Sequence, residues 1–253
     1  MKHIIRATAA ISMAAFMATA AQSEDIDTAG DWSGFYLGGA VGWLNGVSNP
    51  NSSTVQGTYF VTQNLALLDS VLNRNIRGDA VSASMIFGYD MQSNRYTYGV
   101  EGDLTLSNFK ETRASGAVRY LNTPRDFFMD TTVRSSVSAA MRAKIGYSFG
   151  STLVHVSAGP VIANIKYSAA FRDTFSPATT VARLDASETA IGLSLGAGLT
   201  HQLNAGWAVR GDYVFNYFPR AISGTSSFTA GGSFNHKVDF QSHNLRLGLI
   251  KRF

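Results

Sequence analysis

The side chains of this chain that could carry out chemistry are few, because it contains no Cys and only five His. Without Cys there is no disulfide, no Cys-ligated zinc site and no thiol nucleophile. Four of the His, His155, His201, His236 and His243, lie beyond the first 21 residues. No two of them have the spacing that places metal ligands on one face of a helix or strand. They could still meet around a haem, although a His in a solvated loop is the commoner case.

A hydrolase would need a Ser, a His and a carboxylate clustered at one rim of the fold. Asp239, Ser242 and His243 are close in the sequence. However, adjacent residues of a strand point to opposite faces, so Ser242 and His243 should not meet. We therefore predict no catalytic residues, no metal site, no cofactor and no enzymatic activity.

Charged side chains of both signs near the middle of alternating segments are the stronger chemical signal. Glu101 and Asp103 are about as far from a short turn as Arg142 and Lys144, and their segments are neighbours, so these charges can pair. A buried charge without a partner is very costly, so we expect a salt-bridged structural plug. An ion path or a catalytic carboxylate site is the alternative. The positions expected to face the interior are Asp90, Glu101, Asp103, Arg134, Arg142, Lys144, Arg210, Asp212 and Arg246.

The segments that position these charges alternate between apolar and polar residues, which is typical of strands with one apolar and one polar face. The fifth segment is the least regular, because Ile165 and Tyr167 break its parity and Pro160 suggests a bulge or local unpairing. The eight predicted strands are Phe35–Leu44, Val81–Met91, Tyr96–Ser107, Thr132–Phe149, Leu153–Tyr167, Ala190–Gln202, Trp207–Phe218 and His243–Phe253.

The connections between these strands alternate in length. Short turns at one end and long loops at the other are typical of bacterial outer-membrane barrels, whereas a sandwich has no reason to sort its loops in this way. In the first long loop, Leu65, Leu68 and Leu72 have helical spacing and predict a short amphipathic helix able to cap the barrel. We expect it to be a local packing element, and a partner-binding or plugging segment is the alternative. The short links are 92–95, 150–152 and 203–206, and the long ones are 45–80, 110–130, 169–188 and 219–239.

In a soluble barrel the apolar faces of the strands point inward, whereas in a membrane barrel they point outward. Only 15% of the residues are charged, where about a quarter is usual in soluble domains. The chain has no run of 18 apolar residues that could form a spanning helix. Aromatic residues gather at both ends of the strands, as in interfacial girdles. We predict an all-β fold over residues 31–253, an eight-stranded antiparallel transmembrane up-and-down β-barrel with four long extracellular loops.

The first 21 residues are typical of a secretory signal peptide. Lys2 and Arg6 precede the apolar stretch Ala7–Met17, and Ala18–Ala20 supplies small residues for cleavage. Residues 22–30 would then form an acidic periplasmic linker. The whole chain has 21 basic and 17 acidic residues, and cleavage would leave 19 − 17 = +2. A charge this small excludes nucleic acid as an expected partner.

Two segments carry a resemblance to a known family. Asp31–Trp43, with its Trp-Ser-Gly-Phe-Tyr-Leu-Gly-Gly run, resembles the opening strand of small alphaproteobacterial outer-membrane proteins. These are the surface antigens, haemin-binding proteins and "porin family" barrels of the OmpA and OmpX architecture. Asn244–Phe253 resembles their last strand, which implies that Leu249 and Phe253 form the signal read by the barrel-assembly machinery. Lys251 stands where the family usually has an aromatic residue, and we expect slower assembly as a result.

The resemblance implies the fold and an outer-membrane location, but it says little about activity. We expect a structural or surface-antigen role in the cell envelope. The expected partners are outer-membrane lipid and lipopolysaccharide, with a host or extracellular ligand bound through the loops. The alternatives are a narrow porin-like ion channel and a barrel that captures haem or another ligand. The loop bases that could contact lipopolysaccharide phosphates are Lys110, Arg113, Arg119, Arg125, Arg172, Arg183, Arg220 and Lys237.

Overall fold

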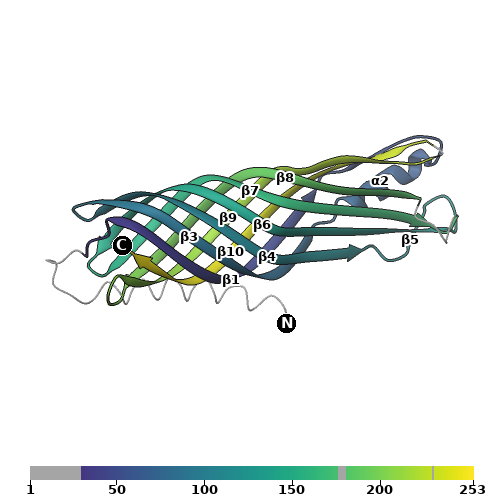
Figure 1. Cartoon of the computed structure of the whole chain (residues 1–253). Coiled ribbons are helices and arrows are strands. Elements are labelled where there is room, and N and C mark those ends of the chain that lie inside the picture. Colours follow the sequence, from purple (N-terminus) through teal and green to yellow (C-terminus); the bar gives the residue numbers. More distant parts are fainter. Residues whose placement is uncertain (1–29, 176–180, 230) are drawn as a thin grey trace.

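The protein is an all-β ring of antiparallel strands with one helix at one end (Figure 1). The computed structural model describes residues 30–175, 181–229 and 231–253, so the predicted signal peptide and most of the linker lie outside the described residues. The ring closes because β1 pairs with both β3 and β10. Its long strands are β1 (Gly34–Pro50), β3 (Ile76–Ser93), β4 (Tyr96–Ala114), β6 (Asp126–Phe149), β7 (Thr152–Asp173), β8 (Ala182–Gln202), β9 (Trp207–Ser227) and β10 (Ser233–Arg252).

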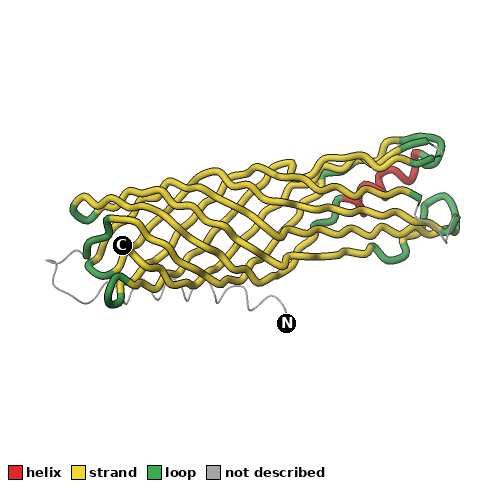
Figure 2. The backbone as a smooth tube through the Cα atoms, in the orientation of Figure 1, coloured by secondary structure: helices red, strands yellow, loops and turns green. Residues whose placement is uncertain are grey.

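The strand count and the loops differ from the prediction. Two short strands join the eight long ones: β2 (Ser53–Val55) pairs with β10, and β5 (Val118–Arg119) pairs with β6. The long strands also continue well into the four regions predicted as loops. The third and fourth of these are mostly strand, because β7 ends at Asp173 and β9 at Ser227. The helix predicted in the first connection is confirmed as α2 (Thr62–Leu72), which is drawn in red in Figure 2.

We divide the ring into a turn half, which contains the three short turns, and a helix half, which contains α2. In the turn half the apolar side chains point outward and form a continuous exposed band. Val100, Leu193 and Leu195 keep 52%, 49% and 43% of their surface exposed. Aromatic side chains border the band, with Tyr96 and Trp207 near the turns. An outward band of this kind is typical of a lipid-facing surface.

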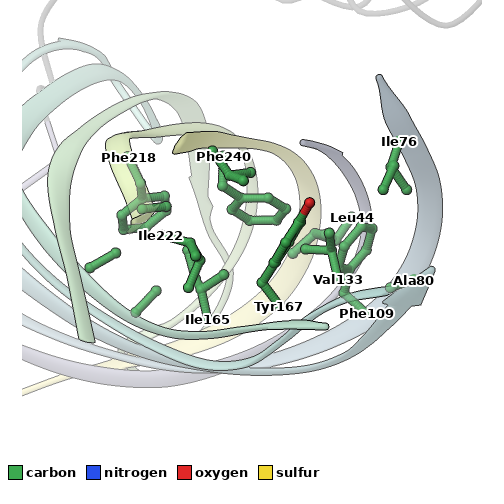
Figure 3. Close-up of a cluster of buried hydrophobic side chains, with 14 of the residues drawn as sticks. Leu44, Ile76, Ala80, Phe109, Val133, Ile165, Tyr167, Phe218, Ile222 and Phe240 are labelled. Carbon is green, nitrogen blue, oxygen red and sulfur yellow. The ribbon is translucent and has the colours of Figure 1, made fainter. Parts of the chain in front are cut away.

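In the helix half the arrangement is reversed, and the interior is apolar. Side chains from every long strand meet inside the ring, where Tyr167, Phe218 and Phe240 point towards one another (Figure 3). The outward positions are polar there, as at Lys166 and Asp185. The apolar core consists of Leu44, Ile76, Ala80, Phe109, Val133, Val161, Ala163, Ile165, Tyr167, Ala169, Ala190, Phe218, Ala221, Ile222, Val238 and Phe240.

This reversal explains why Ile165 and Tyr167 break the predicted parity. Both point inward on a strand whose alternation never changes, and the interior around them is apolar instead of polar. Pro160, in the same strand, causes the predicted local unpairing. Ala140 pairs with Val161 and Ala143 with Ala158, and the described β6–β7 ladder has no pairs between them. A Pro without an N–H is tolerated at such an interruption.

On β6 the alternation itself changes, at a β-bulge. Ser135 pairs with Ile165 and Val137 with Asn164, so Ser136 is an extra residue on the β6 side. One extra residue moves every later side chain to the other face. Val133 is therefore buried and Arg134 exposed. The prediction that Arg134 faces the interior is wrong for this reason.

Candidate functional site

The interior of the turn half contains nine charged side chains, which we call the charge network. They come from β3, β4, β6, β9 and β10, at positions that alternate with the outward apolar residues. Five are cations and four are anions, so the network has a formal charge of 5 − 4 = +1. All are less than a tenth exposed. The network consists of Asp90, Glu101, Asp103, Arg142, Lys144, Arg210, Asp212, Arg246 and Arg252.

Glu101 lies at the centre of the network. Its carboxylate accepts hydrogen bonds from Arg210, with Nη1 at 2.5 Å and Nη2 at 3.0 Å, which is a two-point guanidinium contact. Arg142 Nη2 donates at 3.0 Å, and the hydroxyl of Tyr36 donates at 2.8 Å. Four donors on one buried carboxylate compensate for its removal from water. Glu101 is therefore the residue on which the paired state of the network depends most.

Asp103 and Asp212 link the remaining guanidinium groups. Arg142 also contacts Asp103, and Arg210 Nε lies 2.8 Å from Asp212 Oδ2. Arg246 of β10 lies 3.6 Å from Asp103 of β4 and 3.7 Å from Asp212 of β9. It therefore links two strands that are not neighbours in the ring. The network is a closed set of alternating charges rather than a line of one sign.

The turn end of the network is closed by aromatic rings. Lys144 Nζ lies 2.8 Å from Asp90 and donates at 2.8 Å to the Tyr36 hydroxyl. Arg252 Nη1 donates to Asp90 Oδ2 at 3.2 Å, the oxygen that also accepts from Lys144, and the guanidinium lies over Trp32 and Tyr36, 5.3 Å from each ring. Trp32 is completely buried. These rings fill the interior between the charges and the short turns.

Sequence reasoning missed Trp32, Tyr36 and Arg252 as parts of this site. Trp32 precedes the first strand, and Tyr36 lies on the face that otherwise holds small residues such as Gly38. The small residues are themselves a signal. A side chain at Gly88 would meet the Tyr36 hydroxyl at 2.4 Å, so the glycine makes room for the ring. A face of glycines opposite a large aromatic residue could have identified Tyr36.

The four histidines do not converge on one ligand. His155 is buried within the charge network, 3.2 Å from Asp212, whereas His236 is buried in the helix half beside Ser226 at 2.9 Å. His201 and His243 lie on the outside of the ring, bonded to Thr152 and Tyr213 respectively. Among the residues that the structure describes, no group of three or more His, Asp or Glu could hold a metal ion.

The Asp239, Ser242 and His243 set is separated as the strand geometry predicts. Ser242 is buried inside the ring, and His243 points outward, where its Nδ1 lies 2.6 Å from the Tyr213 hydroxyl. Asp239 accepts a backbone hydrogen bond from Arg220 at 2.7 Å. These contacts do not form the relay that a serine hydrolase requires.

The helix end of the ring is closed by a second apolar cluster around α2. Leu68, Val71 and Leu72 of the helix are buried with Phe171 and Phe234 of the strands. The helix side chains therefore continue the packing of the apolar core to the end of the ring. This confirms the helix as a packing element, with Leu65 only half-buried.

The first two connections meet β7 at Asp173, its last residue. The Tyr59 hydroxyl donates to its carboxylate at 2.5 Å, and the Tyr120 hydroxyl lies 3.4 Å from the same oxygen. Burial and the nearby carboxylate raise the pKa of Tyr59 and of Tyr120 well above their ordinary value. Both hydroxyls therefore stay protonated and keep the first two connections joined to β7.

No helix within the described ranges has the length and apolar character to cross a lipid bilayer. The closed antiparallel ring, its outward apolar band and its charged interior instead define the class of bacterial outer-membrane β-barrels. The chain matches the family model for the outer membrane protein beta-barrel domain over residues 7–250. It therefore belongs to that family, and its location is the outer membrane.

The chain is also similar to individual proteins of known sequence or structure. A 22 kDa outer membrane protein of Rhizobium leguminosarum bv. viciae is 26% identical over 229 residues, which cover 90% of this chain and 82% of the relative. The crystal structure of OprG from Pseudomonas aeruginosa is 12% identical, with a TM-score of 0.50, and covers 90% of this chain and 99% of that one. Neisserial surface protein A is 15% identical, covers 87% and 98% of the two chains, and has a TM-score of 0.39.

Proposed function

We propose that the protein is a closed structural barrel of the outer membrane, with no open passage through it. The eight long strands cross the bilayer through their turn halves, and the helix half projects from the cell as a folded extension. The extension would contribute to envelope integrity and to surface contacts. This orientation follows the general rule that short turns of such barrels lie in the periplasm.

The apolar core is the observation that supports this proposal. All eight long strands contribute side chains to it, so it extends across the whole ring beyond the charge network. An ion that followed the charges into the turn half would next have to enter a layer of apolar side chains. Moving a charge into such a layer is strongly unfavourable. The paired charges of the turn half therefore act as a plug, and the core seals it.

Planar-bilayer recording of the folded protein tests the closed barrel. We expect no stable ion steps from the wild type. A triple variant, Tyr167→Ala, Phe218→Ala and Phe240→Ala, removes three of the four aromatic rings of the core and should produce openings. Steady conductance of the wild type that changes with Glu101→Gln or Arg142→Gln would support the narrow ion channel and overturn the closed barrel.

Haem capture is the other alternative from the sequence, and the separated histidines give it no support. A haem titration of the purified barrel should show no shift of the Soret band that depends on His236 or His243. A saturable shift lost in His236→Ala would instead identify the helix half as a ligand site. The control is His201→Ala, on the outer surface at the turn end.

The C-terminal strand is proposed to be the segment recognised by the barrel-assembly machinery. Leu249 and Phe253 are exposed on the outside of the ring, where a partner could contact them. Lys251, between them, turns its amine to the carbonyl of Ala205 and lies 5.6 Å from the Trp207 ring. A Lys that keeps its charge at the turn end stays out of the hydrocarbon. Lys251→Phe should therefore speed assembly without changing the folded barrel.

A further inference from the structure

Three basic side chains lie side by side on the outside of the ring, beyond the edge of the apolar band. Lys110 of β4 pairs with Arg134 of β6, and Arg134 pairs with Lys166 of β7. Directly opposite residues of adjacent strands point to the same face, and all three side chains are exposed. We call Lys110, Arg134 and Lys166 the basic row. The bulge at Ser136 creates it, because it turns Arg134 outward between the two lysines.

The basic row is not neutralised within the described part of the chain. No carboxylate of the described residues lies within 4.0 Å of any of its three charges. Three exposed bases of the helix half do have a carboxylate partner: Arg119 with Asp126, Arg172 with Asp130 and Arg183 with Asp185. Like charges directly opposite one another on a sheet destabilise it. The row therefore destabilises the folded protein when no ligand is bound, and a bound anion would reduce the repulsion between the three charges.

The position of the row matches the depth of lipid headgroups. Its residues lie three or four positions further towards the helix end than the last outward apolar side chains of their strands, which are Leu106, Val137 and Ile162. At about 3.3 Å per residue along tilted strands, this places the charges roughly 10 Å or less beyond the hydrocarbon edge. The polar headgroup region of a bilayer has about this thickness on each side.

The row occupies only one side of the ring. Near the corresponding edge of the band, β1 has Asn45, β8 has Thr189 and β10 has Gln241, whereas β3 has Asp79 and the exposed base Arg77, and β9 has the exposed base Arg220. A uniform collar of bases would indicate general attraction to an anionic surface. Lys110, Arg134 and Lys166 lie directly opposite one another on β4, β6 and β7, whereas Arg77 and Arg220 have no base opposite them, so the row indicates a local site for a ligand with more than one negative group.

We propose that the basic row binds the phosphate groups of lipopolysaccharide, the phosphorylated glycolipid of the outer leaflet. The acyl chains would lie against the apolar band, and the phosphates would contact Arg134 and the flanking lysines. A guanidinium can hold a phosphate through two parallel hydrogen bonds, and lysines add point charges. The proposal rests on the outer-membrane orientation proposed above and is independent of whether the interior conducts ions.

The direct test compares two triple variants with the same change in charge. The first replaces the row by Gln (Lys110→Gln, Arg134→Gln and Lys166→Gln). The control replaces three ion-paired bases, Arg119, Arg172 and Arg183, by Gln. Binding of bisphosphorylated lipid A is measured on the folded protein in detergent micelles with EDTA, so that divalent cations cannot bridge. A phosphate-free lipid A and inorganic phosphate serve as the other ligands.

We expect the row variant to bind bisphosphorylated lipid A about a hundredfold more weakly, at roughly fivefold for each charge removed. The control should stay within about twofold, because its bases already have partners. Phosphate-free lipid A should bind weakly to all three proteins, and inorganic phosphate should compete poorly since it lacks acyl chains. Equal losses in both triple variants, or none in the row variant, would overturn the proposal.

A single substitution gives a second test, in which the unfolding temperature without lipid A and the rise that lipid A produces in it should change in opposite directions. Arg134→Gln removes both like-charge pairs of the row, so it should raise the unfolding temperature of the lipid-free protein. The same substitution should reduce the further rise that bisphosphorylated lipid A produces in the wild type. If Arg134→Gln destabilises the protein equally with and without lipid A, the arginine has only a structural role. Bilayer recordings of this variant should match the wild type, which separates this site from the closed interior.

Discussion

The turn half and the helix half of the ring use the same strands but place opposite kinds of side chain inside. In the turn half, Glu101 and Arg210 are buried and Val100 is exposed. In the helix half, Phe240 is buried and Lys166 is exposed. The first arrangement suits a hydrocarbon exterior, and the second suits water. The comparison shows that one continuous strand can satisfy two solvents, provided that its side chains are reassigned where the solvents meet.

The strands make this change in two ways. On β7 the alternation continues and only the inward residue types change, from His155 and Ser157 to Ile165 and Tyr167. On β6 the backbone itself changes register at Ser136. The second way depends on one residue, which makes the boundary between the two halves accessible to a simple experiment.

Deletion of Ser136 should have the largest effect of the changes considered. Without the extra residue, one half of β6 must turn over. Either Arg134 enters the apolar core, or Arg142 and Lys144 face lipid without partners. Each outcome leaves charges buried and unpaired, which costs several kcal/mol per charge. We expect no folded barrel on a heat-modifiability gel, whereas Ser136→Ala should assemble normally. Full assembly of the deletion variant would show that another position can absorb the change in parity.

Glu101→Gln should have the next largest effect, because it removes the central anion of the charge network. The formal charge would rise from 5 − 4 = +1 to 5 − 3 = +2, with Arg142 and Arg210 each losing a partner. Breaking a buried ion pair in this way costs about 3–5 kcal/mol. Urea unfolding in lipid vesicles would measure it. The double variant Glu101→Gln with Arg210→Gln keeps the charge at 4 − 3 = +1 and should recover part of the loss.

The two halves also differ in how far the sequence predicts them. In the turn half, the lipid-facing and interior residues alternate regularly, so the strand faces and the inward positions of Glu101 and Arg210 follow from period two. In the helix half, apolar and polar residues alternate as well, but there the apolar residues point inward and the polar residues point outward to water. The extended strands of this half were therefore predicted as loops. Arg134 was assigned to the wrong face because a bulge leaves no mark in the pattern of residue types.

Alkaline pH should act on the helix half alone and have a smaller effect. The pKa values of Tyr59 and Tyr120 are raised in the folded protein, so the unfolded chain ionises first, near pH 10. Their contribution is complete below that pH and is lost as the pH rises further. The hydrogen-exchange protection factors of residues 57–72, which correct for the base-catalysed intrinsic rate, should fall above about pH 10, while those of β4 and β9 in the turn half stay high.

The control for this pH effect is the double variant Tyr59→Phe and Tyr120→Phe. It keeps the rings but removes the hydroxyls that contact Asp173. We expect slightly faster exchange at neutral pH and a weaker dependence above pH 10. If the variant keeps the full alkaline response, other groups open the connections and the contact at Asp173 does not hold them together.

The smallest effect is expected from breaking an exposed arginine–carboxylate ion pair in the helix half. Arg172 and Asp130 form an ion pair at 2.8 Å, but their side chains are 44% and 36% exposed. Water already solvates both groups, so Asp130→Asn should change the free energy of unfolding by no more than about 0.5 kcal/mol. Urea unfolding, run beside Glu101→Gln, measures both. The two variants each remove one carboxylate charge from an arginine pair, so burial is the main difference between them. Equal losses would mean that the interior of the turn half is as well solvated as the outer surface, and the charge network could then no longer be regarded as a dry plug.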